Sequence, residues 1–253
     1  MNNPADYEHL LAEEARVWGN IALQKSRPDW SFVQQMPYQV VYGAEPLRRL
    51  IDRVQPGWRV LELGCSSGWL SLEMARRGAD VEGIDVAEAA IALAQAYALV
   101  HPPSGSVTYR AADINYLPLQ TETYDLIVCI GTLHHLAEVE AVMERIHAAL
   151  KPTGLFYMSE PLDTPPSNAL IAGGLMMLLP THLSYWEKAR HLFRLRGQAI
   201  SHMKDSIEAK GLSPFEGYGR HQDPLELART LFNIHKYDEN NAFTGYVMAQ
   251  LKM

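Results

Sequence analysis

The sequence predicts an α/β protein with a mostly parallel sheet of seven strands flanked by helices. Short apolar strands alternate with amphipathic helices from residue 54 to residue 160. This alternation is typical of parallel sheets whose strands are joined by right-handed crossovers. Apolar residues make up 47% of the 253-residue chain, enough for a large buried core. Length and composition therefore fit one α/β domain with additions.

Apolar periodicity and the residues that interrupt it define the elements of this core. The predicted strands are 60–64, 79–85, 107–110, 124–130 and 155–159. The predicted helices are 68–77, 87–100 and 137–150. Gly78 and the Pro102-Pro103 pair stop the first two helices. Residues 151–154 are expected to form a turn before the last of these strands.

The regions outside the core have a different pattern. We expect a helix near 201–210 and two closing strands, 215–219 and 243–251. The predicted division of the chain is an N-terminal helical cap at 1–53, a ligand-binding core at 54–160, an inserted lid and helix at 161–212, and closing strands at 213–253.

Charge and composition argue against several classes of protein. The net charge of −7 disfavours nucleic acid as a partner, because phosphate contacts need a basic face. The first residues are acidic and polar, unlike a secretory signal. The most apolar run, 169–180, is too short to cross a bilayer and is left open as a lid, a dimer surface or core. We therefore expect a cytoplasmic protein, without stable membrane insertion, in which a homodimer is one alternative.

A glycine-bearing turn, Gly64-Cys65-Ser66-Ser67-Gly68, joins the first strand of the core to its first helix. Such a turn places backbone N–H groups and a helix N-terminus next to a ligand. A dinucleotide site would need glycines at 66 and 69, where this chain has Ser66 and Trp69. Glu62, just before the turn, would repel a pyrophosphate and attract an ammonium group. An NAD or nucleotide-sugar site is therefore disfavoured.

Two more carboxylates follow the next strands. Asp85 comes 21 positions after Gly64, a spacing that suits hydrogen bonds from ribose hydroxyls. Asp113 ends the third strand, where it can accept from the exocyclic amine of a purine. We call Glu62, Asp85 and Asp113 the acidic rim, and their order along one sheet edge suits the amine, ribose and adenine of S-adenosylmethionine. The alternatives are local: a helix N-cap for Asp85 and a turn-forming role for Asp113.

With these motifs the chain resembles the class I S-adenosylmethionine-dependent methyltransferases. The resemblance covers residues 55–160 and is carried in order by VLELGCSSGW, VEGIDV, AADINYLPL, YDLIVCIGTLHHL and KPTGLFYMSE. It implies a Rossmann-like fold, S-adenosylmethionine as cofactor, and methyl transfer to a small molecule of sugar or secondary-metabolite type. Ser66 departs from the family, which most often has glycine there because glycine tolerates a positive φ. We expect cofactor binding to survive this change.

The resemblance also implies roles for individual residues. The methionine end of the cofactor would lie on Glu62, Gly64 and Gly68, and the adenine on Asp113 with Ile114. Residues 129–131 would line the floor under the sulfonium. The complete predicted cofactor set is Glu62, Gly64, Cys65, Ser66, Gly68, Asp85, Val86, Asp113, Ile114 and Ile130.

Two histidines, His134 and His135, follow the fourth strand at the sheet edge where α/β proteins bind ligands. One of them is a candidate base for a substrate hydroxyl, since histidine titrates near neutral pH. Alternatively, they cap the next helix or pack against the loop. No metal-ligand cluster is visible, and Cys65 and Cys129 read as small buried hydrophobes.

Two other functions remain open on this scaffold. One is a protein that binds S-adenosylmethionine without methylating, such as a pericyclase. The other is a methyltransferase that acts on a lipid or quinone at a membrane surface.

Overall fold

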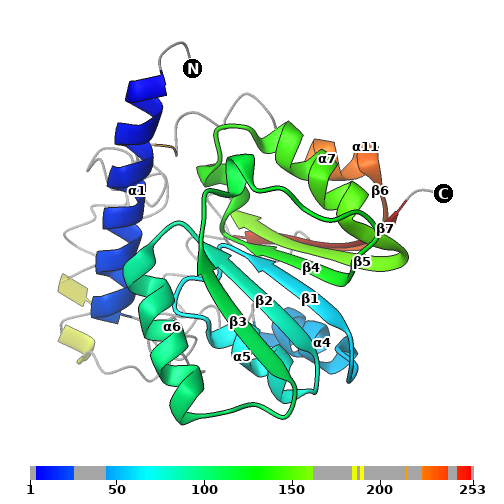
Figure 1. Ribbon diagram of the computed structural model, residues 1–253, viewed down its shortest axis with the longest axis horizontal. Coiled ribbons are helices and arrows are strands. Elements are labelled where there is room, and N and C mark those ends of the chain that lie inside the picture. The colour runs from blue at the N-terminus through cyan, green and yellow to red at the C-terminus, as the bar shows by residue number, and fades with distance from the viewer. Residues whose placement is uncertain are drawn as a thin grey trace.

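The computed structural model describes residues 4–25, 44–161, 184–186, 189–190, 215, 224–238 and 244–251. One sheet of seven strands, in the order β3-β2-β1-β4-β5-β7-β6, runs through the centre of this part of the chain (Figure 1). The strands are β1 (Arg59–Leu63), β2 (Asp80–Asp85), β3 (Ser106–Ala111), β4 (Tyr124–Ile130), β5 (Leu150–Pro161), β6 (Phe232–Asp238) and β7 (Thr244–Leu251).

Neighbouring strands from β3 to β5 all pair in parallel, and β7 pairs antiparallel with both β5 and β6. The predicted α/β class with a parallel sheet is therefore confirmed. The helices of the described chain are α1 (Pro4–Lys25), α4 (Ala44–Arg53), α5 (Trp69–Arg76), α6 (Glu88–Val100), α7 (Val139–Ala149) and α11 (Pro224–Leu231). Two short 3₁₀ turns, η1 (Ile114–Tyr116) and η2 (Leu133–His135), follow β3 and β4.

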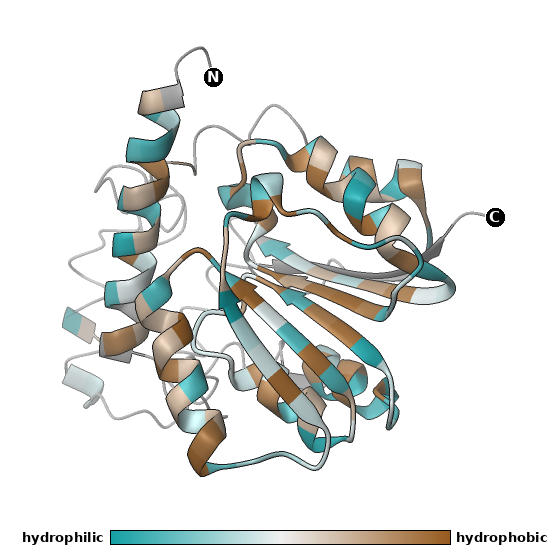
Figure 2. Ribbon diagram, in the orientation of Figure 1, coloured by the Kyte–Doolittle hydropathy of each residue, from teal (hydrophilic) through white to brown (hydrophobic). Residues whose placement is uncertain are grey.

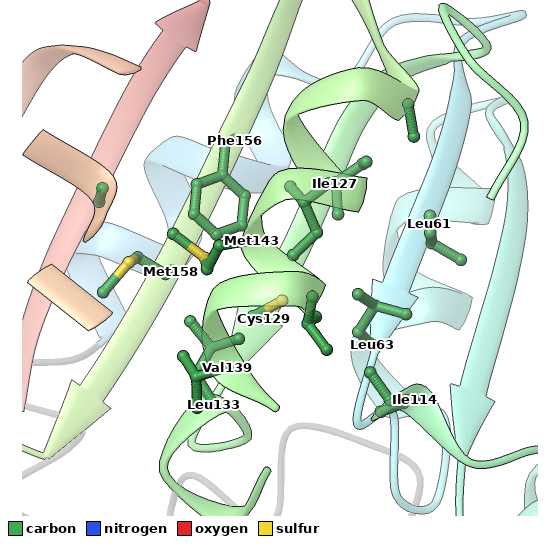
Figure 3. Packing of buried hydrophobic residues seen from close by; sticks show 14 of the residues in the cluster. Leu61, Leu63, Ile114, Ile127, Cys129, Leu133, Val139, Met143, Phe156 and Met158 are labelled. Atoms are coloured by element: carbon green, nitrogen blue, oxygen red, sulfur yellow. The ribbon is translucent and has the colours of Figure 1, made fainter. Parts of the chain in front are cut away.

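Alternate residues of each central strand point to opposite faces of the sheet. On one face, Leu61 and Ile127 belong to the same hydrophobic cluster as residues of α7 (Figure 3). Val60 and Leu126 pack against α4 and α5 on the other. Hydrophobic residues accordingly run along the central strands (Figure 2). Burial on both faces makes the middle of the sheet a rigid support for the loops at its carboxyl edge.

Helix α1 lies beside α6, near the carboxyl ends of β2 and β3 (Figure 1). Small residues permit the close approach. A Cβ at Gly19 would lie 3.3 Å from the Cβ of Ala89, and Ala22 is fully buried against Ala87 and Ala90. The helix therefore has a defined place next to the sheet edge.

The described closing elements differ in part from the prediction. Of the expected strand 215–219, residues 216–219 lie outside the described residues, and Phe215 is a buried residue in a turn. The described edge strand is β6, which follows α11, and neither was predicted. An edge strand has a neighbour on one side only, so β6 tolerates the polar residues of FNIHKYD and lacks a strong apolar signal.

The predicted turn at 151–154 was also wrong, because these residues lie within β5. They form an irregularity in its pairing with β4, between the Tyr124–Leu150 and Leu126–Leu155 partners. The apolar run 169–180 and the helix expected near 201–210 lie outside the described residues. In the described part of the chain, no helix is long and apolar enough to span a membrane.

Candidate active site

The candidate site lies at the carboxyl ends of β1 and β4. These strands are neighbours, and from them the sheet continues in opposite directions, to β2 and β3 on one side and to β5 on the other. The carboxyl ends of the strands at such a point are the usual ligand site of open α/β sheets. Glu62 and Asp85 lie at the ends of β1 and β2, and Asp113 and both histidines lie in the segments that follow β3 and β4.

The loop after β1 depends on glycine at its first position. Gly64 has a φ of 78°, and a Cβ there would lie only 2.0 Å from Oγ1 of Thr132, in the loop after β4. The Thr132 hydroxyl lies 3.1 Å from the carbonyl oxygen of Leu63 and donates to it. The loop after β4 is thus held against Gly64 and the end of β1.

Ser66 takes up the backbone conformation for which the family favours glycine. Its φ is 47°, in the left-handed region that disfavours residues with a Cβ. Its backbone N–H donates to Oδ2 of Asp85 over 2.8 Å. This hydrogen bond offsets part of the conformational strain, so the loop keeps its shape without a glycine at this position.

Gly68 is the N-cap of α5, with a φ of 75°. A side chain there would collide with Tyr109, since a Cβ would lie 2.5 Å from the ring. The Tyr109 hydroxyl donates to the Gly68 carbonyl over 2.7 Å. Tyr109, from β3, thus supports the turn through this hydrogen bond, a role that was not predicted from the sequence.

Glu62 is a buried carboxylate, 4% exposed, that accepts a hydrogen bond from the Ser71 hydroxyl. Burial raises its pKa to about 8, and the nearby negative charge of Asp85 acts in the same direction, while the hydrogen bonds from Ser71 lower it. Among the described residues, none forms an ion pair with it. A buried acid of this kind suits a cationic ligand such as the ammonium group of S-adenosylmethionine.

Asp85 uses both carboxylate oxygens to hold the loop. Oδ2 accepts from Ser66, and Oδ1 accepts from the backbone N–H of Ala87 over 2.9 Å. Burial raises its pKa, although these hydrogen bonds act against that rise. Helix α6 begins at Glu88 with Ala87 as its N-cap, so Asp85 is not the N-cap. Each oxygen retains a lone pair for a ribose hydroxyl.

Asp113 is the N-cap of η1. Its Oδ1 accepts from the backbone and the side chain of Asn115, at 2.9 and 3.0 Å, as the local alternative predicts. Its Oδ2 accepts from the Tyr7 hydroxyl of α1 over 2.6 Å. Burial, together with the Asp113 carboxylate, raises the pKa of Tyr7, which stays a neutral donor. Helix α1 therefore reaches the position at which adenine binding is predicted.

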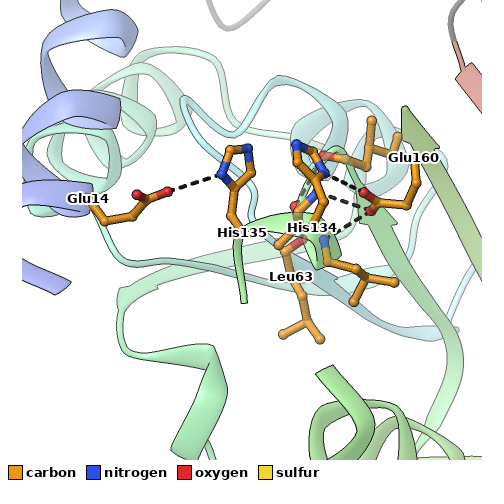
Figure 4. A network of polar contacts seen from close by, with 8 residues as sticks. Glu14, Leu63, His134, His135 and Glu160 are labelled. Atoms are coloured by element: carbon orange, nitrogen blue, oxygen red, sulfur yellow. Dashed lines mark hydrogen bonds and ion pairs between the residues drawn. The ribbon is translucent and has the colours of Figure 1, made fainter. Parts of the chain in front are cut away.

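The two histidines of η2 face different carboxylates (Figure 4). Nδ1 of His134 lies 2.6 Å from Oε2 of Glu160, at the end of β5. Nδ1 of His135 lies 3.3 Å from Oε1 of Glu14, which comes from α1. The two rings are adjacent, with centroids 3.9 Å apart.

Burial distinguishes the two histidines further. The His134 side chain is 27% exposed and that of His135 only 11%. Trp18 packs edge-on against His135 at 5.0 Å and donates its indole N–H to Glu14 over 2.7 Å. Burial lowers the pKa of His135, although Glu14 acts against this effect. His135 is thus the more buried of the two and contacts α1, whereas His134 retains access to solvent.

The remaining predicted residues have simpler surroundings. Cys65 and Cys129 are free, buried thiols whose pKa is raised by burial, so neither is a reactive nucleophile at neutral pH. Ile114 is buried, and Val86 and Ile130 are half-buried. Gly131, after Ile130, is exposed, and a Cβ there would meet nothing within 4 Å.

Side chains that the sequence analysis missed connect the predicted ones. They are Tyr7, Glu14, Ser71, Tyr109, Thr132 and Glu160. Glu160 had a signal: it is the last residue but one of β5, as Asp85 is the last of β2, at the same sheet edge. Tyr7 and Glu14 had none, because their partners lie more than 100 positions away in the sequence.

Comparison with known proteins identifies the family of the chain. Residues 60–154 match the model of a family described as a methyltransferase domain. The chain is 34% identical over 226 residues to a ubiquinone biosynthesis O-methyltransferase from Bordetella avium, covering 85% of this chain and 86% of the relative. It is 32% identical over 184 residues to the protein of that name from Hahella chejuensis, covering 70% and 76%.

Solved structures share the fold. A SAM-dependent methyltransferase from Aquifex aeolicus superposes with a TM-score of 0.53 at 14% identity, covering 93% of this chain and 98% of that one. An S-adenosylmethionine-dependent methyltransferase from Mesorhizobium loti gives 0.53 at 21% identity, covering 81% and 96%. The chain belongs to the class I S-adenosylmethionine-dependent methyltransferases, and S-adenosylmethionine is its cofactor.

Proposed function

We propose that this enzyme transfers the methyl group of S-adenosylmethionine to a hydroxyl oxygen of a small, ring-bearing acceptor of the quinol type. The observation that carries the proposal is the partly exposed His134, bonded to a buried carboxylate next to the acidic rim. The proximity is set by Thr132, whose N–H donates to Glu160 and whose hydroxyl donates to the Leu63 carbonyl at the end of β1. A hydroxyl must lose its proton when it is methylated, and His134 is the group placed to accept it.

The cofactor supplies an electrophilic methyl group, so the chain has to bind, orient and exclude water. Glu62 would hold the amine, Asp85 the ribose, and Asp113 with Ile114 the adenine. Backbone of the glycine turn, with Cys65, Ser66 and Gly68, would surround the methionine end, and Val86 and Ile130 would contribute apolar walls.

The acceptor would bind between the N-terminal cap, the loop after β4 and the insertion after β5. Trp18 supports this placement, because it packs against His135 beside the candidate base. The names of the relatives in B. avium and H. chejuensis favour a quinol-type acceptor over a sugar. In the proposed division, residues 54–160 form the core and residues 213–253 add the closing strands of its sheet. Residues 1–53 and 161–212 would form the two walls of the acceptor site.

Product analysis tests the function. The protein would be incubated with S-adenosylmethionine and each of three probes: catechol, a short-chain hydroquinone and glucose. S-adenosylhomocysteine and a singly methylated phenol are expected from the first two only. Methylated glucose would favour the sugar alternative. Bound S-adenosylmethionine without any S-adenosylhomocysteine from all three probes would contradict methyl transfer to a hydroxyl and favour a non-methylating role.

A further inference from the structure

We propose that Glu160 is a positioning residue, which holds His134 in the one neutral tautomer that can take a proton from the acceptor. This inference rests on the proposed function, since it assigns the partner of the candidate base. It makes the end of β5 a part of the catalytic machinery, although the sequence analysis placed no site residue there.

The Glu160 carboxylate is fixed from both sides. It is 4% exposed, and Oε1 accepts from the backbone N–H groups of Thr132 and Leu133 at 3.1 and 3.0 Å. These donors belong to the loop after β4, so their positions are set by the central strands. The other oxygen, Oε2, is thereby directed at His134 (Figure 4).

The contact of His134 with Oε2 selects a tautomer. A carboxylate accepts hydrogen bonds and cannot donate them, so Nδ1 of His134 carries the proton across the 2.6 Å contact. In a neutral imidazole the other nitrogen, Nε2, is then the basic one. Nε2 would receive the proton of the acceptor hydroxyl, and the negative charge of Glu160 would stabilise the imidazolium that forms.

The second histidine provides a comparison within the same turn. The titratable groups around His134 in the described chain are Glu160 from β5, His135 beside it in η2, and Glu14 from α1 behind His135. Glu14 also accepts from the Trp18 indole. The His135–Glu14 pair connects η2 to α1. The His135 side chain is 11% exposed and that of Glu14 is 4% exposed.

Replacing Glu160 with glutamine removes the negative charge and changes the hydrogen bond to His134, while the size of the side chain stays the same. Its carbonyl oxygen can still accept from Thr132 and Leu133, because an NH₂ group facing those two donors would be repelled. The NH₂ then faces His134 and donates to Nδ1, which moves the ring proton to Nε2. Glu160→Gln should therefore reverse the tautomer while the loop stays in place.

The experiment combines nitrogen NMR of the histidines with kinetics. In the native protein at pH 8, His134, assigned by comparison with His134→Gln, should show protonated Nδ1 and unprotonated Nε2, and Glu160→Gln should reverse the two shifts. With catechol as the acceptor, the same variant should lower kcat at least about 100-fold. Its kcat should also lose the rise with pH that deprotonation of His134 produces, while the Kd of S-adenosylhomocysteine stays within about twofold.

Glu14→Gln is the matched control, because it makes the same chemical change next to His135. Oε1 of Glu14 faces both the Trp18 indole and Nδ1 of His135, so a glutamine carbonyl can keep both contacts. Glu14→Gln should therefore leave the tautomers of both histidines unchanged and keep the rise of kcat with pH. The proposal is overturned if Nε2 of His134 is protonated in the native protein, or if Glu160→Gln reverses the tautomer and leaves kcat and its pH profile intact. If no hydroxyl acceptor turns over, the proposed function fails, while the NMR arm still decides whether Glu160 sets the tautomer.

Discussion

The buried Glu62 makes a prediction that needs no acceptor: replacing it with glutamine should make the cofactor-free protein more stable at alkaline pH. Burial raises its pKa from 4.5 to about 8. Because the folded protein holds this proton more tightly than the unfolded chain, the contribution to stability is complete below pH 4.5 and is lost as pH rises through about 8. The interval between the two values corresponds to about 5 kcal/mol at most.

Glutamine has the same shape and does not titrate. The unfolding free energy of Glu62→Gln minus that of the native protein should therefore rise by several kcal/mol between pH 5 and pH 8.5. Urea unfolding at the two pH values measures this difference. Other buried acids, including Asp85, are common to both proteins and cancel to first order. A difference that is independent of pH would show that Glu62 is ionised at little cost in the folded protein.

The same group should couple cofactor binding to pH. If the ammonium group needs an ionised Glu62, binding at pH 7 includes about 1.4 kcal/mol for ionising a carboxyl whose pKa is about 8. The affinity should thus rise about tenfold between pH 7 and alkaline pH. Calorimetry at pH 7 in buffers of different ionisation enthalpy should show proton release. Glu62→Gln controls for titration of the ligand amine, and equal proton release from both proteins would refute the reasoning.

Three further substitutions test the loop after β1. Gly64→Ala should lower the unfolding free energy by more than about 2 kcal/mol, because the φ of Gly64 is positive and a Cβ would collide with Thr132. Gly57→Ala is the control: Gly57 has a φ of 79° and open space around it, so this variant measures the cost of the positive φ alone. Ser66→Gly should leave the unfolding free energy equal or up to about 1 kcal/mol higher, because the backbone N–H that donates to Asp85 remains. The affinity for the cofactor should not fall. Urea unfolding measures the first quantity and titration calorimetry the second, and a loss of either would contradict the prediction. Asp85→Ala should weaken S-adenosylhomocysteine by about 1–3 kcal/mol, and a ribose role requires that a 2′-deoxy analogue lose affinity for the native protein more than for the variant.

The sequence by itself determined the class of fold and the edge of the sheet where the site lies. Strand–helix alternation fixed the parallel core, because each buried strand needs an apolar run and each crossover helix an apolar stripe. Glu62, Asp85 and Asp113 could be assigned to one edge, since the carboxyl ends of parallel strands meet there. Local backbone chemistry was also readable: the positive φ at Ser66 follows from the turn that the family resemblance implies.

Only the tertiary structure decided how the two adjacent histidines differ. In sequence His134 and His135 are equivalent, but a strand end 26 positions later supplies the partner of the first, and α1 that of the second. It also showed that Asp85 holds the loop through both oxygens, and that β6 closes the sheet. These outcomes depend on contacts between distant segments, whose geometry is set by packing of the whole core, and no local pattern of residues contains that information.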